Sequence, residues 1–407
     1  MAFLTVTYPP SIGGAQVHVQ RVAEGLATRD HQVEVITTDA ARSPAGRRPG
    51  HVGPSHELLG GVSVRRIPFA RRTHALLRGV DRVRLRVQPD LDVERPLRLG
   101  PHGVRFVNAA IAAGRRSDVV VGCPAPYSTV LAPRIVARGG AAAVAMPLLH
   151  LTGGDPVPEV RWALRGCQGL TSSTSVERDA LVRCGVDRER IAVLPPGCDP
   201  DRHPDVSPSE ARRRLGLPDR PTVGYLGRLA AYKGIDTLLD ASRRLWSTHP
   251  GTTVVIAGSA VGWEGLDALV ASVERDAGDR LVVRRDFPAE DKAHLLASCD
   301  VVVLPSREES FGMVTAEAWC ARRPVVAADI PAVRCVIEDG VDGDLVPAGD
   351  ADRLADAVTC LLEDPRRAQR YGEAGRRKAE TDLSWDHVLD GWEELLADAV
   401  ARRRIRR

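Results

Sequence analysis

Long uninterrupted apolar runs are missing from this chain of 407 residues. No stretch reaches the roughly eighteen consecutive apolar residues that a membrane-spanning helix needs, which argues against a transmembrane protein. A basic and apolar leader is missing as well, because strand-like residues start at Ala2. We therefore expect a cytoplasmic protein that neither spans a membrane nor is secreted.

Paired cysteines are also missing. The sequence has no C-x-x-C pair and no zinc-ligand spacing among its eight cysteines, which lie at positions 123, 167, 184, 198, 299, 320, 335 and 360. This pattern excludes a dense disulfide framework and fits thiols that stay reduced in a cytoplasm. Most of these cysteines are expected to be packing residues.

The chain has little excess charge, since its net charge of +3 is too small to indicate a nucleic-acid partner. The charge is nevertheless uneven, with thirteen arginines against four acids from Arg65 to Arg116 and a basic end at Arg402–Arg407. The basic segment lies in the first half of the chain, which we predict below to be a separate domain. This basic first domain could contact an anionic membrane face or an acidic acceptor. The alternative, which we favour, is a solvated arginine-rich surface with a frayed terminus.

The length exceeds what one hydrophobic core usually serves, so two domains are expected. We predict a first domain over 1–195, a proline-rich linker over 196–208, a second domain over 209–382 and a C-terminal helix over 383–407. That last helix carries an unbroken apolar stripe and must pack on something. The stretch 68–104 lacks clean periodicity and is expected to be a mobile loop with short helices.

Both halves repeat a strand, loop, helix and strand, which is the unit of a parallel doubly wound α/β sheet. The first half opens with a strand over 3–6 and the second with a strand over 222–226. The further predicted strands lie at 32–37, 62–67, 119–121, 143–147, 191–194, 253–257, 281–283, 301–304 and 324–328.

Two carboxylates lie eight positions apart, Glu309 and Glu317, just after the predicted strand over 301–304. A helix that begins near Gly312 would offer unpaired N–H groups to a phosphate. Along a helical path eight positions cover roughly 12 Å, so one carboxylate could face a sugar and the other a ribose. The alternative is a surface helix with two glutamates at this spacing by chance.

The loop over 227–234 follows the first strand of the second half, where doubly wound domains bind ligands. Its two cations, Arg228 and Lys233, could neutralise a diphosphate and the charge that grows on it as it leaves. In the first half, Gly13 and Gly14 allow close backbone approach to a ligand. Because they form no G-x-G-x-x-G, a nicotinamide or flavin site is not expected.

Two histidines are further candidates. His150 follows the predicted strand over 143–147 and could hydrogen-bond near a reacting sugar, although a satisfied structural histidine is the alternative. His18 is a candidate on the acceptor side. Three D-x-D pairs, which begin at Asp90, Asp342 and Asp350, could hold a metal, but two cations already fill that role, so we predict no metal.

The elements G-R-L-x(3)-K-G at 227–234, E-x7-E at 309–317 and Pro324-Val325-Val326 occur in order. Their arrangement resembles that of glycosyltransferase family 4, the retaining enzymes with the GT-B architecture. The resemblance implies two Rossmann-like doubly wound domains that face each other across a cleft, with the C-terminal helix crossing back to the first. It also implies retaining, metal-independent transfer of a sugar from a nucleoside-diphosphate sugar, with uridine as our default base.

The same resemblance assigns roles to residues of this sequence. Arg228 and Lys233 would grip the donor phosphates, Glu309 the transferred sugar and Glu317 the ribose hydroxyls. The backbone of Phe311, Gly312, Met313, Val314 and Thr315 would lie along the sugar and phosphates, with Gly13, Gly14 and His150 facing them. No cofactor beyond the nucleotide-sugar is implied, and the acceptor would be a small molecule or lipid-linked. A nucleotide-sugar epimerase, a phosphorylase or a non-catalytic sugar-nucleotide-binding protein are the alternatives.

Overall fold

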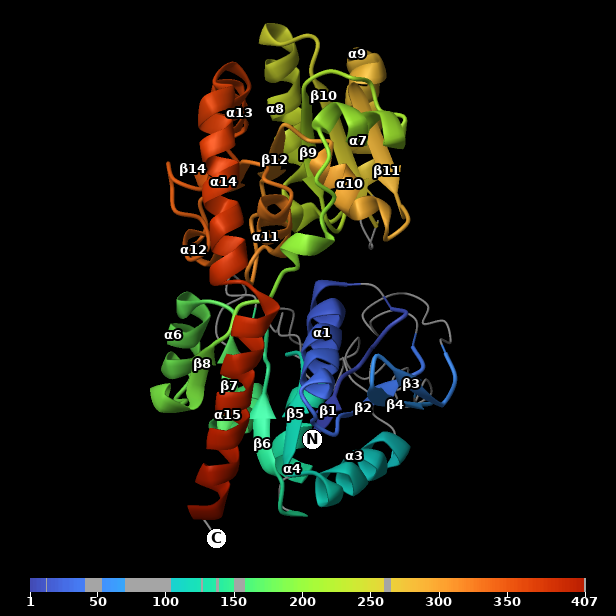
Figure 1. The fold of residues 1–407 in the computed structure, drawn as a ribbon, viewed down its shortest axis with the longest axis vertical. Coiled ribbons are helices and arrows are strands. Elements are labelled where there is room, and N and C mark those ends of the chain that lie inside the picture. The colour runs from blue at the N-terminus through green and yellow to red at the C-terminus, as the bar shows by residue number, and fades with distance from the viewer. Residues whose placement is uncertain are drawn as a thin grey trace, which may run out of the picture. The chain divides into compact units, whose positions relative to one another are not determined.

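The computed structural model describes residues 1–11, 13–40, 53–69, 104–125, 127–136, 139–149, 158–259 and 265–405. The chain divides into two compact units (Figure 1). The first unit comprises Met1–Pro195 together with Val388–Arg407, and the second comprises Pro196–His387. The predicted linker over 196–208 therefore belongs to the second unit, where Pro200–Arg202 form the short helix η6.

The described strands of the first unit form one eight-stranded sheet with the order β3-β4-β2-β1-β5-β6-β7-β8. They are β1 (Ala2–Leu4), β2 (Glu34–Thr38), β3 (His56–Leu59), β4 (Val62–Ile67), β5 (Val119–Gly122), β6 (Ala142–Ala145), β7 (Gly169–Ser172) and β8 (Ile191–Val193). Every described pairing is parallel except that of β3 with β4. Because the chain winds outward from β1 in one direction and from β5 in the other, the sheet is doubly wound.

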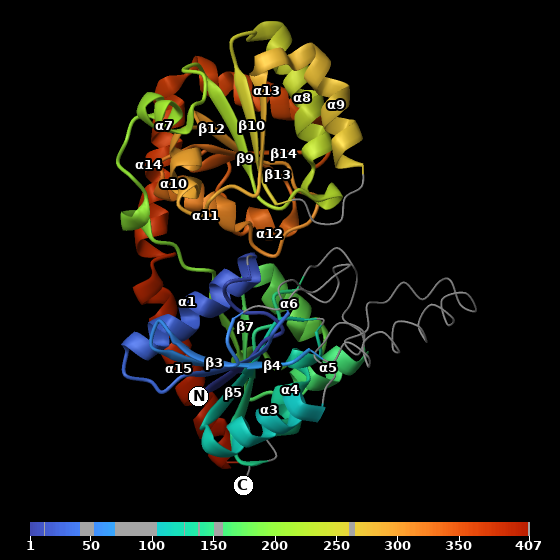
Figure 2. The same cartoon turned by 90° about the vertical axis from the view of Figure 1, so that its right-hand side faces the viewer.

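Helices cover both faces of this sheet, with α1 and α15 on one side and α3 and α4 on the other (Figure 2). The described helices are α1 (Gly14–Thr28), α3 (Val104–Arg116), η2 (Ser128–Val130), α4 (Ala132–Val136), α5 (Pro158–Arg165), α6 (Ser175–Arg183), η5 (Arg188–Arg190) and α15 (Trp385–Ile405). The apolar residues of α1 recur with helical periodicity, and its Val22 and Leu26 are fully buried. On the opposite face, Phe106 of α3 packs in one core with Ile36 of β2.

The end of the chain completes the first unit. Trp392 of α15 is fully buried, with its ring centroid 6.1 Å from that of Phe3 on β1. Arg29, just after α1, donates to Asp390 at 2.6 Å and to Glu393 at 2.8 Å. Near the other end of α15, Arg402 donates to the carbonyl of Glu189. These contacts give the predicted apolar stripe its packing partner.

The second unit contains a six-stranded, wholly parallel sheet with the order β11-β10-β9-β12-β13-β14. Its strands are β9 (Thr222–Leu226), β10 (Thr253–Gly258), β11 (Leu281–Arg285), β12 (Val301–Leu304), β13 (Val325–Ala328) and β14 (Gly343–Val346). Counted from β9, the order is third, second, first, fourth, fifth and sixth, which is that of dinucleotide-binding domains.

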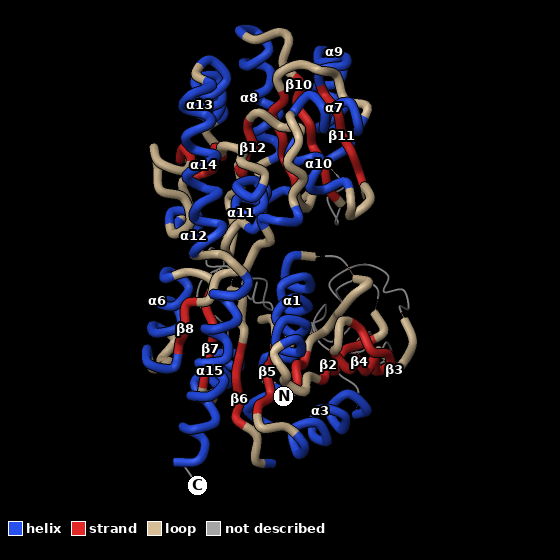
Figure 3. The backbone as a smooth tube through the Cα atoms, viewed as in Figure 1, coloured by secondary structure: helices blue, strands red, loops and turns tan. Residues whose placement is uncertain are grey.

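Helices flank both faces of this second sheet as well (Figure 3). They are α7 (Pro208–Leu215), η7 (Ala231–Lys233), α8 (Ile235–Thr248), α9 (Leu266–Ala277), η8 (Gly278–Arg280), α10 (Asp291–Ala297), α11 (Met313–Cys320), α12 (Pro331–Arg334), α13 (Ala351–Glu363) and α14 (Pro365–Thr381). The apolar residues of α8, α9 and α13 share one buried cluster. Those of α7, α10 and α11 share another on the opposite face.

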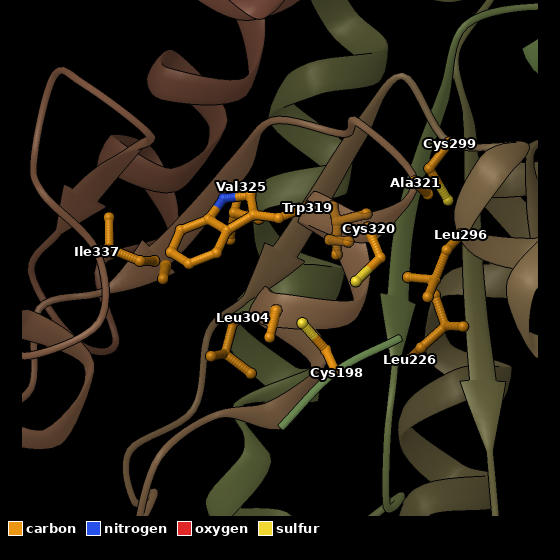
Figure 4. Close-up of a cluster of buried hydrophobic side chains, with 14 of the residues drawn as sticks. Cys198, Leu226, Leu296, Cys299, Leu304, Trp319, Cys320, Ala321, Val325 and Ile337 are labelled. Carbon is orange, nitrogen blue, oxygen red and sulfur yellow. The ribbon is translucent and has the colours of Figure 1, made fainter. Parts of the chain in front are cut away.

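This second cluster fixes α11 against β12 and β13 (Figure 4). Trp319 of α11 is fully buried, and its indole N–H donates to the carbonyl of Asp342 at 2.9 Å. A Cβ on Gly375 of α14 would lie 2.0 Å from the Trp319 ring, so only glycine lets α14 approach this closely. The helix that carries Glu317 is therefore rigidly seated.

Local sequence pattern does not predict β3, β7 or β14. The edge strand β3 alternates exposed and half-buried residues, so it has no buried apolar run. A Cβ on Gly169 of β7 would lie 2.9 Å from Leu395, and one on Gly343 of β14 would lie 2.7 Å from the carbonyl oxygen of Val325. These two strands carry glycine because other elements press against them, which weakens their apolar signal.

Six of the eight cysteines are buried as free thiols, which confirms that most are packing residues. No helix in the described ranges combines the length and the apolar character that crossing a bilayer demands. Residues 70–103, which make up nearly all of the predicted mobile loop over 68–104 and most of the arginine-rich segment over 65–116, lie outside the described residues.

Candidate active site

Two loops leave the second sheet where its winding reverses. One follows β9 and the other follows β12, and these parallel strands are neighbours. The loops are joined, because the N–H of Arg307 donates to the carbonyl of Tyr232 at 2.8 Å. Ligands of doubly wound domains bind at such a switch point, beyond the carboxyl ends of the strands.

Glycines bring these loops together. Gly234 has φ +70°, and a Cβ there would lie 1.9 Å from the carbonyl oxygen of Pro305. A Cβ on Gly258, at the end of β10, would lie 1.7 Å from the carbonyl oxygen of Gly227. Both contacts involve backbone atoms, which cannot rotate away as a side chain would. Gly234, which ends the cationic loop, and Gly258, which contacts the first residue of that loop, therefore have a defined geometric role.

Lys233 and Glu309 meet across the switch point. Lys233 Nζ lies 2.6 Å from Glu309 Oε1, and their side chains are only 11% and 9% exposed. Ser306 Oγ donates to the same carboxylate oxygen at 2.9 Å. Within the described part of the chain Oε2 has no hydrogen-bond partner, so its lone pairs remain available to a ligand hydroxyl.

Glu317 lies on α11 and pairs with a second lysine, since Lys292 Nζ of α10 is 2.5 Å from Glu317 Oε1. Nothing in the local sequence indicates this contact, because Lys292 lies 25 residues earlier and on another helix. The path between the two glutamates also differs from the predicted one. Helix α11 begins only at Met313, so Glu309 lies in the preceding loop and the two are not one helical path apart.

Arg228 is exposed and follows the strand β9. The buried hydroxyl of Tyr225 donates to the carbonyl of Arg228 at 2.7 Å, which fixes the loop backbone. Burial raises the pKa of Tyr225, so this hydroxyl stays protonated and keeps donating. Among the described residues the Arg228 guanidinium has no carboxylate partner, and its charge is free to meet a ligand.

Helix α11 begins where the sequence predicts a helix terminus that could bind a phosphate. Gly312 precedes the helix with φ +88°, whereas the side chain of Phe311 is buried in the core. Met313 and Val314 form the first turn, whose N–H groups have no partner within the helix. Thr315 Oγ1 is buried and has no hydrogen-bond partner among the described residues, which is the kind of orphaned group that a ligand would satisfy.

The site residues predicted in the first unit are Gly13, Gly14, His18 and His150. Gly14 begins α1, and Gly13 immediately precedes it with φ 164°. His18 is 2% exposed, and burial lowers its pKa to about 4, so its imidazole is neutral. The acceptor-side role of His18 stays a prediction. His150 lies outside the described residues.

A buried carboxylate contacts Leu149, the residue that precedes His150 in the sequence. Glu177 of α6 accepts from the N–H of Leu149 and from the N–H of Ser173, both at 2.7 Å. It is fully buried, and this burial raises its pKa to about 7. Glu177 thus anchors the chain just before His150, a role that no local sequence pattern indicates.

We expect Glu177 to make stability depend on pH. Between the unfolded value of 4.5 and the native value of about 7, the native state holds one more proton than the unfolded state. Its contribution is therefore complete below pH 4.5 and falls by about 1.4 kcal/mol per pH unit as pH rises toward 7. Urea unfolding of wild type and Glu177→Gln at pH 5 to 8 measures this slope as a stability difference that shrinks with pH.

A matched control is Glu189→Gln, because Glu189 is an exposed carboxylate of the same unit. Its stability difference from wild type should not change with pH. Parallel curves for wild type and Glu177→Gln would contradict the assignment.

The described D-x-D pairs have structural partners. Asp342 accepts from Lys378 at 2.9 Å, and Asp344 accepts from Tyr371 at 2.9 Å. Asp350 caps α13 through the N–H of Arg353, while Asp352 pairs with Arg244. The remaining pair at 90–92 lies outside the described residues. Across the described ranges no group of three or more His, Cys, Asp or Glu side chains is placed to hold a metal ion.

Two family models match the chain. Residues 13–197 match the glycosyl transferase 4-like domain, and residues 208–378 match glycosyl transferases group 1. The second match contains both loops of the switch point. Together the two leave out only 1–12, 198–207 and 379–407.

Known proteins agree with these matches. A D-inositol 3-phosphate glycosyltransferase of Xylanimonas cellulosilytica is 36% identical over 247 residues, which is 58% of each chain. One of Stackebrandtia nassauensis is 28% identical over 97% of this chain and 88% of its own. The structure of Anabaena HepE in complex with UDP-glucose has a TM-score of 0.72 at 18% identity, covering 97% of this chain and 98% of that one.

The predicted GT-B architecture of two Rossmann-like doubly wound domains is confirmed by the two sheets and by this structural likeness. The order of motifs, the two sheets and the paired family models all point the same way. The chain therefore belongs to the group 1 glycosyl transferases, of the family 4 type.

Proposed function

We propose that this protein is a retaining, metal-independent glycosyltransferase that moves a sugar from a UDP-sugar to an acceptor hydroxyl. The observation that carries the proposal is the buried pair of Lys233 and Glu309 at the switch point of the second sheet. HepE, which shares the fold, is in complex with UDP-glucose, and this favours uridine as the base.

Arg228 and Lys233 are the groups that would bind the diphosphate. As the glycosidic bond breaks, negative charge grows on the leaving nucleoside diphosphate, and fixed cations stabilise that charge without reorganising. Lys233 is held in place by Glu309, whereas Arg228 projects from a loop whose backbone is tied to Tyr225. The N–H groups that begin α11 add further donors for phosphate oxygens.

Glu309 is suited to hold the sugar rather than to attack it. Its Oε1 already accepts from a lysine and a serine, which lowers the nucleophilicity of the carboxylate. The open Oε2 can accept from a sugar hydroxyl. We infer that the leaving phosphate takes the acceptor proton on the same face, as the family resemblance implies. The enzyme then contributes position and charge.

Glu317 would accept from the ribose hydroxyls, with Lys292 orienting its carboxylate. We therefore expect Glu317→Gln to raise KM for a UDP-sugar about tenfold or more, because a hydrogen bond to a charged group contributes about 1.5–3 kcal/mol. Steady-state kinetics with the donor and its 2′-deoxy and 3′-deoxy ribose analogues test this. The variant should lose least, relative to wild type, on the analogue that lacks the hydroxyl bound by Glu317.

The control for this kinetic comparison is Glu290→Gln, which removes an exposed carboxylate just before α10. It should leave KM for every donor unchanged. An equal loss by Glu317→Gln on the natural donor and on both analogues would place its action elsewhere than at the ribose.

The proposed reaction is tested by incubating the protein with a panel of nucleotide-sugars and acceptors, with and without EDTA. The panel includes inositol phosphates, since two relatives are D-inositol 3-phosphate glycosyltransferases. We expect a new glycoside with the anomeric configuration of the donor, measured by NMR, and unchanged yield in EDTA. Inverted product would refute retention, and lost yield in EDTA would refute metal independence.

The alternatives give different products in the same reactions. An epimerase would convert the donor without any acceptor, and a phosphorylase would form or consume a sugar phosphate. A protein that only binds sugar nucleotides would show affinity with no turnover on any acceptor.

A further inference from the structure

A cationic pocket lies in the first unit, lined by residues of the neighbouring helices α4 and α5. The two helices are labelled in Figure 2. Its volume is about 370 Å³, and it is lined by Arg134, Pro158, Arg161, Trp162 and Arg165. Among the described lining residues there are three guanidinium groups and one indole, and none of these residues carries a carboxylate. Such a set of side chains has no part in the chemistry proposed for the second unit.

Arg134 of α4 is held in a preformed position. Its guanidinium stacks 3.9 Å from the centre of the Trp162 ring and donates to the carbonyl of Trp162. On its other side lies Gly166, where a Cβ would come within 2.3 Å of Arg134 Nε. Only the missing side chain of Gly166 leaves room for the guanidinium. Little side-chain entropy remains to be lost when Arg134 binds a ligand.

Arg165 of α5 is held in a similar way. Its Nε donates to the carbonyl of Cys184 at 2.6 Å, and a Cβ on Gly185 would lie within 2.6 Å of that nitrogen. Gly185 has φ +85°, a conformation that favours glycine. Two of the three cations are thus held by hydrogen bonds to backbone carbonyls.

One structural explanation is that these arginines serve only as partners for carbonyls at helix ends. Trp162 lies in the last turn of α5, and Cys184 follows the last turn of α6, where carbonyls lack helical partners. That explanation leaves out Arg161, which is half-buried in the pocket. Among the side chains that the structure describes, none of the three guanidinium groups has a carboxylate partner. Three like charges around one hollow favour a bound anion.

We propose that this pocket binds the phosphate group of an organic phosphate. Guanidinium groups match phosphate oxygens bidentately, and three of them suit a dianion better than a single carboxylate. The exposed part of Trp162, which is 43% exposed, would contact the carbon portion of the ligand. A pocket above about 300 Å³ has room for more than the phosphate itself. The source is either a free phosphate ester or the headgroup of an anionic lipid.

The test uses the full chain and two probes, glycerol 3-phosphate in calorimetry and vesicles of phosphatidylglycerol in sedimentation. The variant is Arg161→Gln, because Arg161 has no bond that holds the fold among the described residues. We expect it to weaken binding of whichever probe binds by at least tenfold. The control Arg183→Gln removes an exposed arginine of α6 outside the pocket and the same net charge, and it should change affinity less than twofold.

The outcomes separate the sources from each other and from non-specific attraction. Binding of glycerol 3-phosphate alone identifies a free phosphate ester, whereas binding of the vesicles alone, with none to phosphatidylcholine vesicles, identifies a lipid headgroup. Equal weakening by Arg161→Gln and Arg183→Gln would overturn the proposal, because a built site distinguishes them. No binding of either probe, or binding that Arg161→Gln does not weaken, would overturn it as well. None of these results depends on whether the protein transfers a sugar.

Discussion

Replacing Lys233 by methionine is expected to lower kcat/KM for sugar transfer by about 10²–10³-fold or more. The loss has that size because one preorganised charge at a developing anion contributes roughly that factor. Methionine keeps the length of the side chain but removes the charge that meets Glu309 at 2.6 Å. The measurement is steady-state transfer with the donor found in the product assay, normalised to folded protein.

Lys233→Met is also expected to lower stability, because it leaves the Glu309 carboxylate, which is only 9% exposed, without its cation. Breaking a buried pair by removing one partner costs about 3–5 kcal/mol. The double variant Lys233→Met/Glu309→Gln removes both charges and should regain much of that stability, measured by urea unfolding. It should remain inactive. Recovery of activity together with stability would show that Lys233 acts on the fold alone.

A second, partly buried pair supplies a control. Arg212 and Asp300 lie 2.9 Å apart in the same unit but on the opposite end of β9, with side chains 7% and 32% exposed. Arg212→Met should lose stability, although less than Lys233→Met because Asp300 is more exposed than Glu309, and should keep its turnover per folded molecule. Asp350→Ala, which removes the N-cap of α13, should cost about 1 kcal/mol and leave transfer unchanged. A loss of turnover in these controls equal to that of Lys233→Met would refute the catalytic role.

Gly234→Ala is expected to lower the free energy of unfolding by about 2–5 kcal/mol and to abolish transfer. A left-handed residue other than glycine costs about 1–2 kcal/mol, and overpacking adds about 1–3 kcal/mol. Here the new Cβ would lie 1.9 Å from the carbonyl oxygen of Pro305, a clash between the two loops of the switch point. Relief requires the loops to separate, which would also separate Lys233 from Glu309.

The control for this change is Gly251→Ala, because a Cβ there has no atom within 4 Å and the residue is exposed. It should leave both unfolding and transfer unchanged within error. Chemical denaturation and the product assay of both variants give the comparison. A fully active Gly234→Ala would mean that the two loops need not touch for transfer.

The sequence reveals those parts of the site that depend on local order along the chain. Strand, loop and helix follow one another around both Lys233 and Glu309, and adjacent parallel strands bring their loops to one edge. Lys292 is different, since its contact with Glu317 depends on how α10 lies beside α11. No periodicity in the sequence encodes that distance.

The same distinction explains the fold. Strands such as β12 are continuous apolar runs and are predicted directly, whereas β7 and β14 carry glycine because distant elements press on them. Likewise, the pocket formed by Arg134, Arg161 and Arg165 joins two helices whose positions depend on the completed first sheet. His18 is a candidate from the sequence, whereas its burial depends on how α1 packs in the completed fold.

The discontinuity of the first unit constrains the order in which the protein can be made. Residues 388–407 are synthesised after 196–387, so Phe3 cannot pack against Trp392 until the whole second unit has left the ribosome. The second unit is continuous in sequence and can fold before the first unit is complete. A nascent chain therefore exposes the apolar surface that Trp392 covers beside Phe3 until α15 has been synthesised, and assistance from a chaperone would matter most for the first unit.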